Sequence, residues 1–262
     1  MSLRKITRQE ELTGNRPQQM LFTEEVTTIE GFYPFDSERG KIENKFKDYI
    51  HEVLELGSNV SYVGNKKIPF LRIYRYKEAF AFDFVTEFLR RFEANSDDYV
   101  FDPFSGMGTT MFASMTCGIP SVGLDKLPIA YFISKTLPSF LVLKENELKG
   151  IWTALIPKIQ RSEPAEVALD VPIMRVAFDD ETLLTLRKLK TAIEGLPSPY
   201  LDLFLFPFFS ILEECSFTSK DGQFLRLNRN KTTSNPIDAM NRKIAQIEED
   251  VHRMKLLPMT HR

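Results

Sequence analysis

Apolar side chains recur at helical spacing over most of the chain. The spacing predicts a first helix over residues 37–57, ended by Gly57, and a second over residues 78–93, "EAFAFDFVTEFLRRFE", with an aromatic face. That aromatic face, which includes Phe80, favours burial in the core. Further helices are predicted over residues 108–117, 128–137, 145–160, 179–194, 200–214 and 236–256.

Alternation of apolar and polar positions indicates a few short strands. Residues 59–76, "NVSYVGNKKIPFLRIYRY", alternate around a Gly64–Asn65 turn signal and predict a β-hairpin. "DDYVFDP" predicts a strand ended by Pro103, and "IPSVGLD" predicts another strand after only one helix. Strand, helix and strand in this order form a βαβ unit with a parallel pair. "VPIMRVAF" is a candidate for one more short strand.

Residues 216–235 interrupt the helical pattern. Their sequence, "SFTSKDGQFLRLNRNKTTSN", is polar and basic and predicts a functional or disordered loop. The part "RNKTTSN" is interpreted either as a solvated loop or as a loop that contacts phosphate.

Composition narrows the class of protein. The chain has 262 residues, of which 43% are hydrophobic, so it can bury a sizeable core in one large domain or two small ones. Its net charge of −2 gives no overall attraction to nucleic acid, so any basic surface must be local. The two cysteines lie far apart, and no apolar run reaches the roughly 18 residues that a membrane span needs. We therefore expect a cytoplasmic protein with no membrane contact, and the histidine spacing indicates no metal site.

The stretch "VFDPFSGMGTT", residues 100–110, carries the main functional signal. A strand that ends at Asp102 and turns on Gly106 and Gly108 into a helix presents backbone N–H groups to an anion or a carboxylate. Asp125 ends the second strand, where an acid typically accepts hydrogen bonds from a ribose diol. The pattern favours a nucleoside-containing cofactor, although Asp125 could instead cap the helix that begins at Pro128.

The cofactor is not expected to be a dinucleotide. The dinucleotide fingerprint requires a small residue at position 111, where this chain has Met111. A nicotinamide enzyme is therefore a weaker alternative.

The combination of "DPFSGMGTT" with "GIPSVGLDKLPIA" resembles the S-adenosyl-L-methionine motif of amino-methylating DNA methyltransferases, which make N4-methylcytosine or N6-methyladenine. The upstream stretch "YKEAFAFDFVTEFLRRF" resembles the helix that flanks the cofactor in that family. The resemblance covers residues 66–132, about a quarter of the chain. It implies direct attack of a flipped base amine on the methyl sulfonium, with DNA as partner and without a metal.

The resemblance also assigns cofactor-binding residues. The methionine end of the cofactor would be lined by Asp102, Phe104, Ser105, Gly106, Gly108 and Thr109. Asp125 would hold the ribose, and Phe80 falls on the upstream motif together with Lys77 and Ala79.

The catalytic motif of that family is not found. It consists of Asp, Ser or Asn followed by Pro-Pro and an aromatic residue, and this chain has no Pro-Pro dipeptide. The nearest stretch, "TSNPID", lacks the second proline and the aromatic ring. The catalytic residues therefore remain unknown, and we expect either a missing segment or a second polypeptide to supply them.

The expected fold class is α/β, a Rossmann-like S-adenosyl-L-methionine-dependent methyltransferase fold with an incomplete sheet and a large helical insertion. The expected organisation is an N-terminal arm over residues 1–36, a cofactor-binding α/β region over 37–140, and a mainly helical region over 141–262 for target recognition or partner binding. Two other functions stay open, a non-catalytic cofactor-binding subunit of a split methyltransferase and an RNA or protein methyltransferase.

Overall fold

The computed structural model describes residues 37–49, 53–168, 171–221 and 224–256. The predicted arm over residues 1–36 lies outside this part of the chain. Contacts divide the chain into two units, residues 1–60 and residues 61–262. Each unit is described by itself.

In the first unit, helix α1 (Glu38–Phe46) begins at Ser37, whose hydroxyl accepts a hydrogen bond from the Gly40 N–H at 3.0 Å. Short 3₁₀ helices, η2 (Lys47–Tyr49) and η3 (Leu54–Asn59), follow it. The prediction of one regular helix to Gly57 was therefore wrong. None of the α1 residues is buried, so tertiary packing does not stabilise the longer helix that the apolar spacing predicts.

The second unit begins with turns where a hairpin was predicted. Residues 62–67 form a 3₁₀ helix, η4 (Tyr62–Lys67), and no strand is assigned over the described residues 59–76. The Asn65 side chain donates to the Phe80 carbonyl and accepts from the Phe82 N–H, both at 2.8 Å. Asn65 thus holds the start of α2 (Phe82–Arg91) and does not sit at a hairpin turn.

The βαβ prediction is confirmed. Strand β1 (Val100–Asp102), helix α3 (Thr109–Thr116) and strand β2 (Ser121–Gly123) follow one another, and the strands pair in parallel with Phe101 opposite Val122. Helices α2 and α3 cover one face of this sheet, where Val100 packs against the cluster of Val85, Leu89, Ala113 and Ile119.

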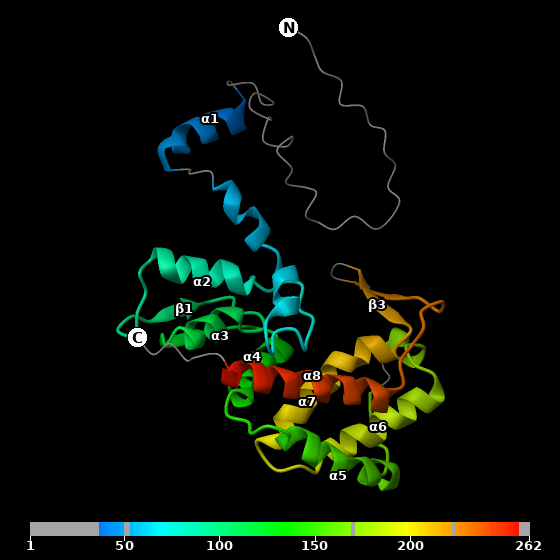
Figure 1. Ribbon diagram of the computed structural model, residues 1–262. Coiled ribbons are helices and arrows are strands. Elements are labelled where there is room, and N and C mark those ends of the chain that lie inside the picture. Colours follow the sequence, from blue (N-terminus) through cyan, green and yellow to red (C-terminus); the bar gives the residue numbers. More distant parts are fainter. Residues whose placement is uncertain (1–36, 50–52, 169–170, 222–223, 257–262) are drawn as a thin grey trace. The chain divides into compact units, whose positions relative to one another are not determined.

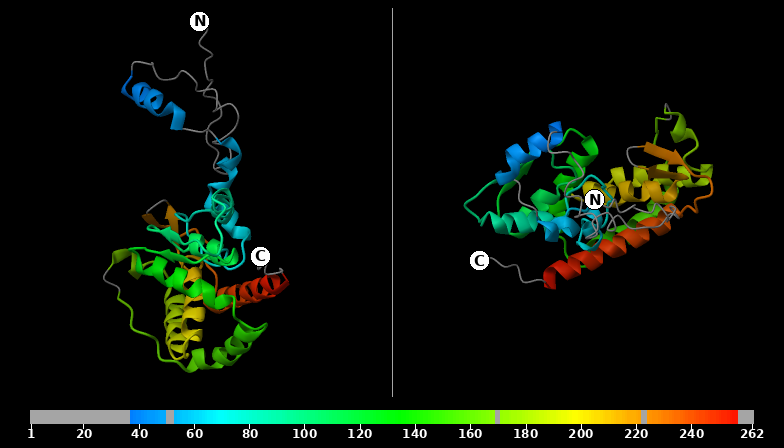
Figure 2. Two further views of the ribbon diagram at one scale, coloured as in Figure 1. Left: turned by 90° about the vertical axis from the view of Figure 1, so that its left-hand side faces the viewer. Right: turned by 90° about the horizontal axis from the view of Figure 1, so that it is seen from above.

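Five helices form the larger core of the second unit (Figures 1 and 2). They are α4 (Pro128–Phe140), α5 (Glu147–Arg161), α6 (Asp180–Glu194), α7 (Tyr200–Cys215) and α8 (Pro236–Leu256). All five were predicted, and α8 packs on α5, α6 and α7. Aromatic rings fill the centre, including the perpendicular pair Phe140–Phe206 with ring centroids 5.1 Å apart.

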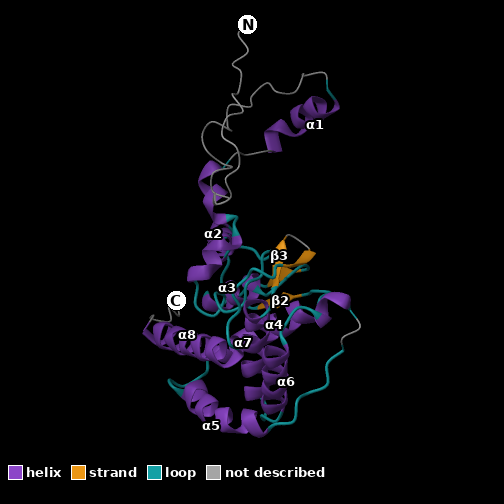
Figure 3. Ribbon diagram, turned by 90° about the vertical axis from the view of Figure 1, so that its right-hand side faces the viewer, coloured by secondary structure: helices purple, strands orange, loops and turns teal. Residues whose placement is uncertain are grey.

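Two expectations for the connecting segments were wrong. The stretch "VPIMRVAF" contains a 3₁₀ helix, η5 (Pro172–Arg175), and no strand. The segment predicted as a loop over 216–235 carries an antiparallel pair, β3 (Thr218–Asp221) and β4 (Phe224–Leu227), held by backbone pairing that its polar composition concealed. Figure 3 shows in orange how short the strands are beside the helices.

A buried carboxylate joins the start of the second unit to its last helix. Asp250 on α8 is 0% exposed and accepts from the Phe70 N–H at 2.8 Å and from Arg72 Nε at 3.1 Å. Arg72 also contacts Glu249 at 2.7 Å. Burial raises the pKa of Asp250, and the arginine and amide contacts oppose that shift.

The architecture is mixed, mostly helical with two small sheets, and is compatible with an α/β methyltransferase. Among the described residues, no helix is long and apolar enough to cross a membrane. The same residues contain no group of three or more His, Cys, Asp or Glu side chains suited to a metal ion.

Candidate cofactor site

Asp102 stabilises the turn that follows β1. Its side chain is 7% exposed, and one carboxylate oxygen accepts from the Phe104 N–H at 3.0 Å. The other oxygen accepts from the Thr110 hydroxyl at 2.6 Å, on the first turn of α3. Both oxygens therefore fix the path from strand to helix.

Asp125 joins the same turn to the start of α4. One carboxylate oxygen accepts from the Gly106 N–H and the other from the Leu127 N–H, each at 2.8 Å. The N-cap residue of α4 is Leu127, with no side-chain cap hydrogen bond, so Asp125 closes a short turn before the helix and does not cap it as the alternative expected. A carboxylate offers about four acceptor sites, and the two that remain on this half-buried side chain could accept from a ribose diol.

The backbone of the turn is mostly paired within the protein. The Ser105 N–H donates to the Leu124 carbonyl at 2.9 Å and the Gly108 N–H donates to the Ser105 carbonyl at 2.8 Å. Together with the bonds from Phe104 and Gly106, four amides of the turn already have acceptors. These four amides are therefore not available to an anion, whereas the expectation that the N–H groups at the start of α3 face one stays a prediction.

Both glycines of the turn have positive φ, as predicted, at +51° for Gly106 and +88° for Gly108. A Cβ at Gly108 would lie 2.6 Å from the Ser134 Cβ and 3.0 Å from its Cα. The Gly108 position is therefore restricted by the close approach of α4. A Cβ at Gly106 would lie 3.3 Å from the Tyr76 ring.

Thr109 carries an unsatisfied polar group. The side chain is 2% exposed, and its hydroxyl oxygen is buried without a hydrogen-bond partner. A buried hydroxyl without a partner in a native fold calls for an explanation, and a bound ligand is one. Thr109 is the first residue of α3, directly after the glycine turn.

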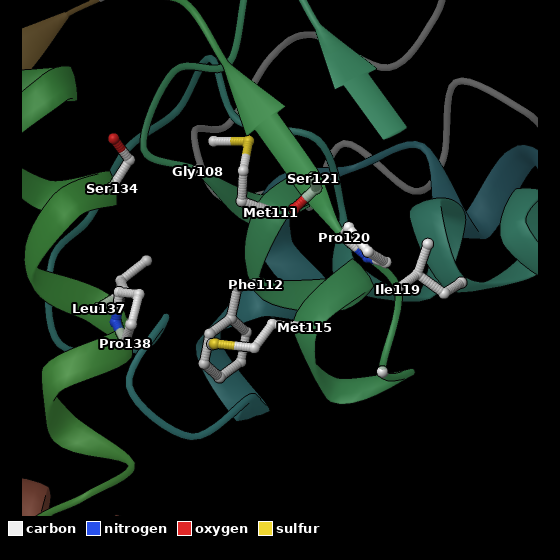
Figure 4. Close-up of a pocket in the computed structure, with 11 residues that line it drawn as sticks. Gly108, Met111, Phe112, Met115, Ile119, Pro120, Ser121, Ser134, Leu137 and Pro138 are labelled. Atoms are coloured by element: carbon white, nitrogen blue, oxygen red, sulfur yellow. The ribbon is translucent and has the colours of Figure 1, made fainter. Parts of the chain in front are cut away.

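Two cavities flank the βαβ unit, and four of the eight predicted site residues line one or the other. Phe80, Asp102 and Phe104 line a cavity of about 560 Å³ beside β1 and α2. Gly108 lines a second cavity of about 480 Å³ between α3 and α4, in which Figure 4 shows Met111, Phe112 and Met115 facing the α4 side chains. Both volumes are in the usual range of ligand pockets.

The expectation that the aromatic face of α2 is buried in the core was wrong, because its rings line the larger cavity. Phe80 is 51% exposed, and Phe84 and Phe88 are half-buried at the cavity wall. Val85 and Leu89, on the neighbouring side of α2, supply the helix's buried contacts instead.

Sequence reasoning missed two residues of the site. Thr110 was not assigned a role, although its hydroxyl reaches Asp102. Tyr76 lies against Gly106, and its pKa is raised by burial and by the negative charge of Asp125. The available signal was that Tyr76 is the first residue of the upstream stretch "YKEAFAFDFVTEFLRRF".

Known proteins match this chain over most of its length. The type II methyltransferase M.AvaI, from Nostoc sp. and from Anabaena variabilis, is 30% identical over 223 residues, which are 82% of this chain and 46% of M.AvaI. The type II methyltransferase M.BsoBI of Geobacillus stearothermophilus is 31% identical over 192 residues, which are 72% of this chain and 38% of M.BsoBI.

The chain thus spans less than half the length of these curated relatives. No family model and no solved structure matches it. The match extends well beyond the glycine turn, into the helices that follow it, because it covers far more residues than the resembling stretch. By sequence, this chain is a relative of the type II DNA methyltransferases.

Proposed function

We propose that this chain forms the cofactor-binding part of an S-adenosyl-L-methionine-dependent DNA methyltransferase that methylates a base amine, on adenine N6 or cytosine N4. The observation that carries the proposal is the orphaned Thr109 hydroxyl at a strand–glycine turn–helix unit, in a chain that aligns with type II methyltransferases. The Rossmann-like fold and a cytoplasmic location belong to the same proposal.

The residues around the turn fit such a cofactor in part. The Thr109 hydroxyl and the free acceptor sites of Asp125 would hold it, with Phe80 and Phe104 as apolar contacts from the larger cavity. Asp102 and Gly108 would act indirectly, by fixing the shape of the turn. Asp102 pairs with Thr110, and Gly108 allows the close approach of α4. Ser105 and Gly106 have their amides paired, so they would shape the site.

When bound, S-adenosyl-L-methionine supplies an electrophilic methyl group on a sulfonium. The contribution of this chain is to hold the donor in one orientation, so that a base amine can approach in line. The residues that clamp the flipped base are proposed to lie in another segment or polypeptide, since the sequence has no Pro-Pro-aromatic motif.

The test uses a pair of nearly isosteric substitutions. Thr109→Val removes a hydroxyl that has no partner, so stability is expected to hold or to rise while cofactor affinity falls about tenfold, the effect of one lost hydrogen bond. Thr110→Val removes the hydroxyl that pairs with Asp102, so its main effect is expected on stability. Calorimetric titration with S-adenosyl-L-methionine and its demethylated product, beside thermal unfolding, separates the two.

An unchanged affinity of Thr109→Val for S-adenosyl-L-methionine would show that this threonine does not bind the cofactor. Absence of binding by the unaltered chain would contradict the proposed cofactor role. Methyl transfer to mixed-sequence DNA by the chain alone would contradict the proposed separation of the catalytic residues.

A further inference from the structure

The hairpin β3–β4 has one face on the protein and one face in solvent, and it lies at the surface beside α7 (Figure 1). Thr218, Lys220 and Leu225 line a cavity of about 230 Å³ against α7 and the η5 segment. Their neighbours along each strand point the other way, since successive side chains of a strand alternate. This outer face therefore carries Phe224 and Arg226 of β4, and Phe224 is 72% exposed.

Hydrogen bonds fix the hairpin to the end of α7. The Lys231 ammonium donates to the Thr218 carbonyl at 2.7 Å and also to the Glu213 carbonyl. The Glu213 carboxylate accepts from the Lys220 N–H at 3.1 Å, and the Thr218 and Ser216 hydroxyls share a hydrogen bond of 2.6 Å. The outer face is thus presented by a fixed pair of strands, which positions side chains more precisely than a loop does.

The hairpin also adjoins the segment that leads to the candidate cofactor site. The Lys77 ammonium donates to the Lys220 carbonyl at 3.1 Å. Tyr76, the residue before Lys77, lies against Gly106 in the glycine turn. Two contacts thus connect the hairpin to the turn, so the hairpin is close to the residues proposed to hold the methyl donor.

Residues 218–231, which include the hairpin, are basic in a chain that is not. They comprise four basic residues and one acidic residue, whereas the whole chain has a net charge of −2. Lys231 is bonded to main-chain carbonyls, and Arg229 is exposed in the turn after β4. A local positive surface attracts a polyanion, and under the proposed function that polyanion is the phosphate backbone of DNA.

The outer face has the shape and the residue types of a DNA reader. The major groove of B-form DNA admits a two-stranded ribbon, where arginine pairs with guanine and phenylalanine contacts the thymine methyl group. Arg226 and Phe224 lie two residues apart on one face of the ribbon, so both can meet base edges from the same side. Arg229 lies beyond the end of β4, in a position suited to a phosphate.

We propose that the outer face of the hairpin β3–β4 enters the major groove of the substrate duplex, with Arg226 and Phe224 at base edges and Arg229 at a phosphate. This rests on the proposed function, since it takes DNA as the substrate. Arg226 is then a specificity-determining residue, whereas Arg229 contributes affinity without sequence preference.

The test uses the methyltransferase isolated from its native cells through a tag on this chain, so that every further segment or polypeptide is present. Binding to a pool of duplexes of randomised sequence is measured at several salt concentrations, and the bound fraction is sequenced. Arg226→Gln should lower the preference at one base pair by about tenfold. Arg226→Lys should lose the same preference while keeping the charge, since lysine lacks the planar fork of arginine.

Arg229→Gln should weaken binding to all duplexes alike and reduce the slope of log affinity against log salt by about 1. Arg161→Gln, at the exposed end of α5, removes the same charge elsewhere and should change neither the preference nor the slope. Thermal unfolding of each variant checks that the fold is retained.

The outcomes separate this inference from the proposed function. Arg226→Gln and Arg226→Lys with the sequence preference of Arg161→Gln would overturn the base readout, and an unchanged salt slope in Arg229→Gln would overturn the phosphate contact. Failure of the unaltered protein to bind the duplex pool would contradict DNA as the substrate, and the inference with it. Titration with S-adenosyl-L-methionine tests the cofactor role independently of these results.

Discussion

The helical region α4–α8 and the βαβ unit bury their apolar residues to different extents. Leu189, Leu203 and Phe204 in the helical region are 0% exposed. In the βαβ unit, Phe101 and Leu124 are 58% and 57% exposed. Both regions are rich in large apolar side chains, but those on the sheet remain exposed, whereas the core of the helical region is closed with the help of Phe70 and of Phe112 from α3.

This difference indicates where the free energy of unfolding resides. Burial of an apolar side chain contributes roughly 1.5–3 kcal/mol, and the helical region collects most of that contribution. The βαβ unit instead depends on glycine geometry, on two carboxylates and on the one face that α2 and α3 cover. Substitutions of apolar residues should therefore lower the free energy of unfolding more in the helical region than in the βαβ unit.

The largest difference is expected between two phenylalanines. Phe204→Ala leaves a cavity beside Trp152, whose ring is stacked at 6.3 Å, and should destabilise the chain by about 3–5 kcal/mol. Phe101→Ala removes an exposed ring and should change stability by no more than about 0.5 kcal/mol. Urea unfolding of both variants measures this. Equal losses would mean that the face of Phe101 is covered in solution.

The next effect concerns the buried carboxylate that joins the two ends of the second unit. Asp250→Ala leaves the Phe70 N–H without its acceptor and leaves Arg72 with only Glu249 and the Gln246 carbonyl, so a loss of about 3 kcal/mol is expected. Glu249→Ala removes only the exposed partner and should have a much smaller effect. Thermal unfolding that ranks these two variants in the opposite order would contradict this role of Asp250.

A smaller loss is expected at the glycine turn. Gly108→Ala combines positive φ with a 2.6 Å contact to Ser134, whereas Gly118→Ala has φ +71° and nothing within 4 Å. Positive φ alone should reduce stability by about 1–2 kcal/mol, so Gly108→Ala should lose more than Gly118→Ala. Adding Ser134→Gly should recover part of the Gly108→Ala loss and none of the Gly118→Ala loss. If Ser134→Gly recovers no stability, the loss in Gly108→Ala comes from the backbone conformation alone.

The smallest effect is expected on the solvent side of α2. Arg90 and Arg91 lower the pKa of Glu87 from its ordinary 4.5 to about 2. Because the folded pKa is depressed, the contribution of this carboxylate is present above pH 4.5 and is lost as pH falls through about 2. A nuclear magnetic resonance titration should find this low midpoint, and Arg90→Gln should raise it. A midpoint near 4.5 would show that these exposed pairs do not persist in solution.

The sequence predicted the elements whose signals are local. The helices after residue 125 were predicted because their apolar residues keep a helical spacing over many positions. The βαβ unit was predicted from Pro103, Gly106 and Gly108. The hairpin over residues 59–76 failed because Asn65 pairs with Phe80 and Phe82, a contact that alternation does not encode.

The candidate site was predictable only in outline. Asp102 and Asp125 were expected near one another, since both follow parallel strands at the same edge of the sheet. The bond from the Gly106 N–H to Asp125 could not be inferred, because it joins residues 19 positions apart. The approach of Ser134 to Gly108 is a long-range contact with no local signature. The roles of Phe80, Phe104 and Thr109 toward a cofactor stay predictions.

The contact between Phe70 and Asp250 has a consequence for biosynthesis. The two residues are 180 positions apart, so the acceptor of the Phe70 N–H is the last part of this contact to be translated. At roughly 5–20 residues per second, Phe70 and Arg72 wait on the order of ten to forty seconds for their carboxylate. During that interval the Phe70 N–H and the Arg72 guanidinium lack this acceptor, so the segment around Phe70 cannot complete its packing until α8 has been made.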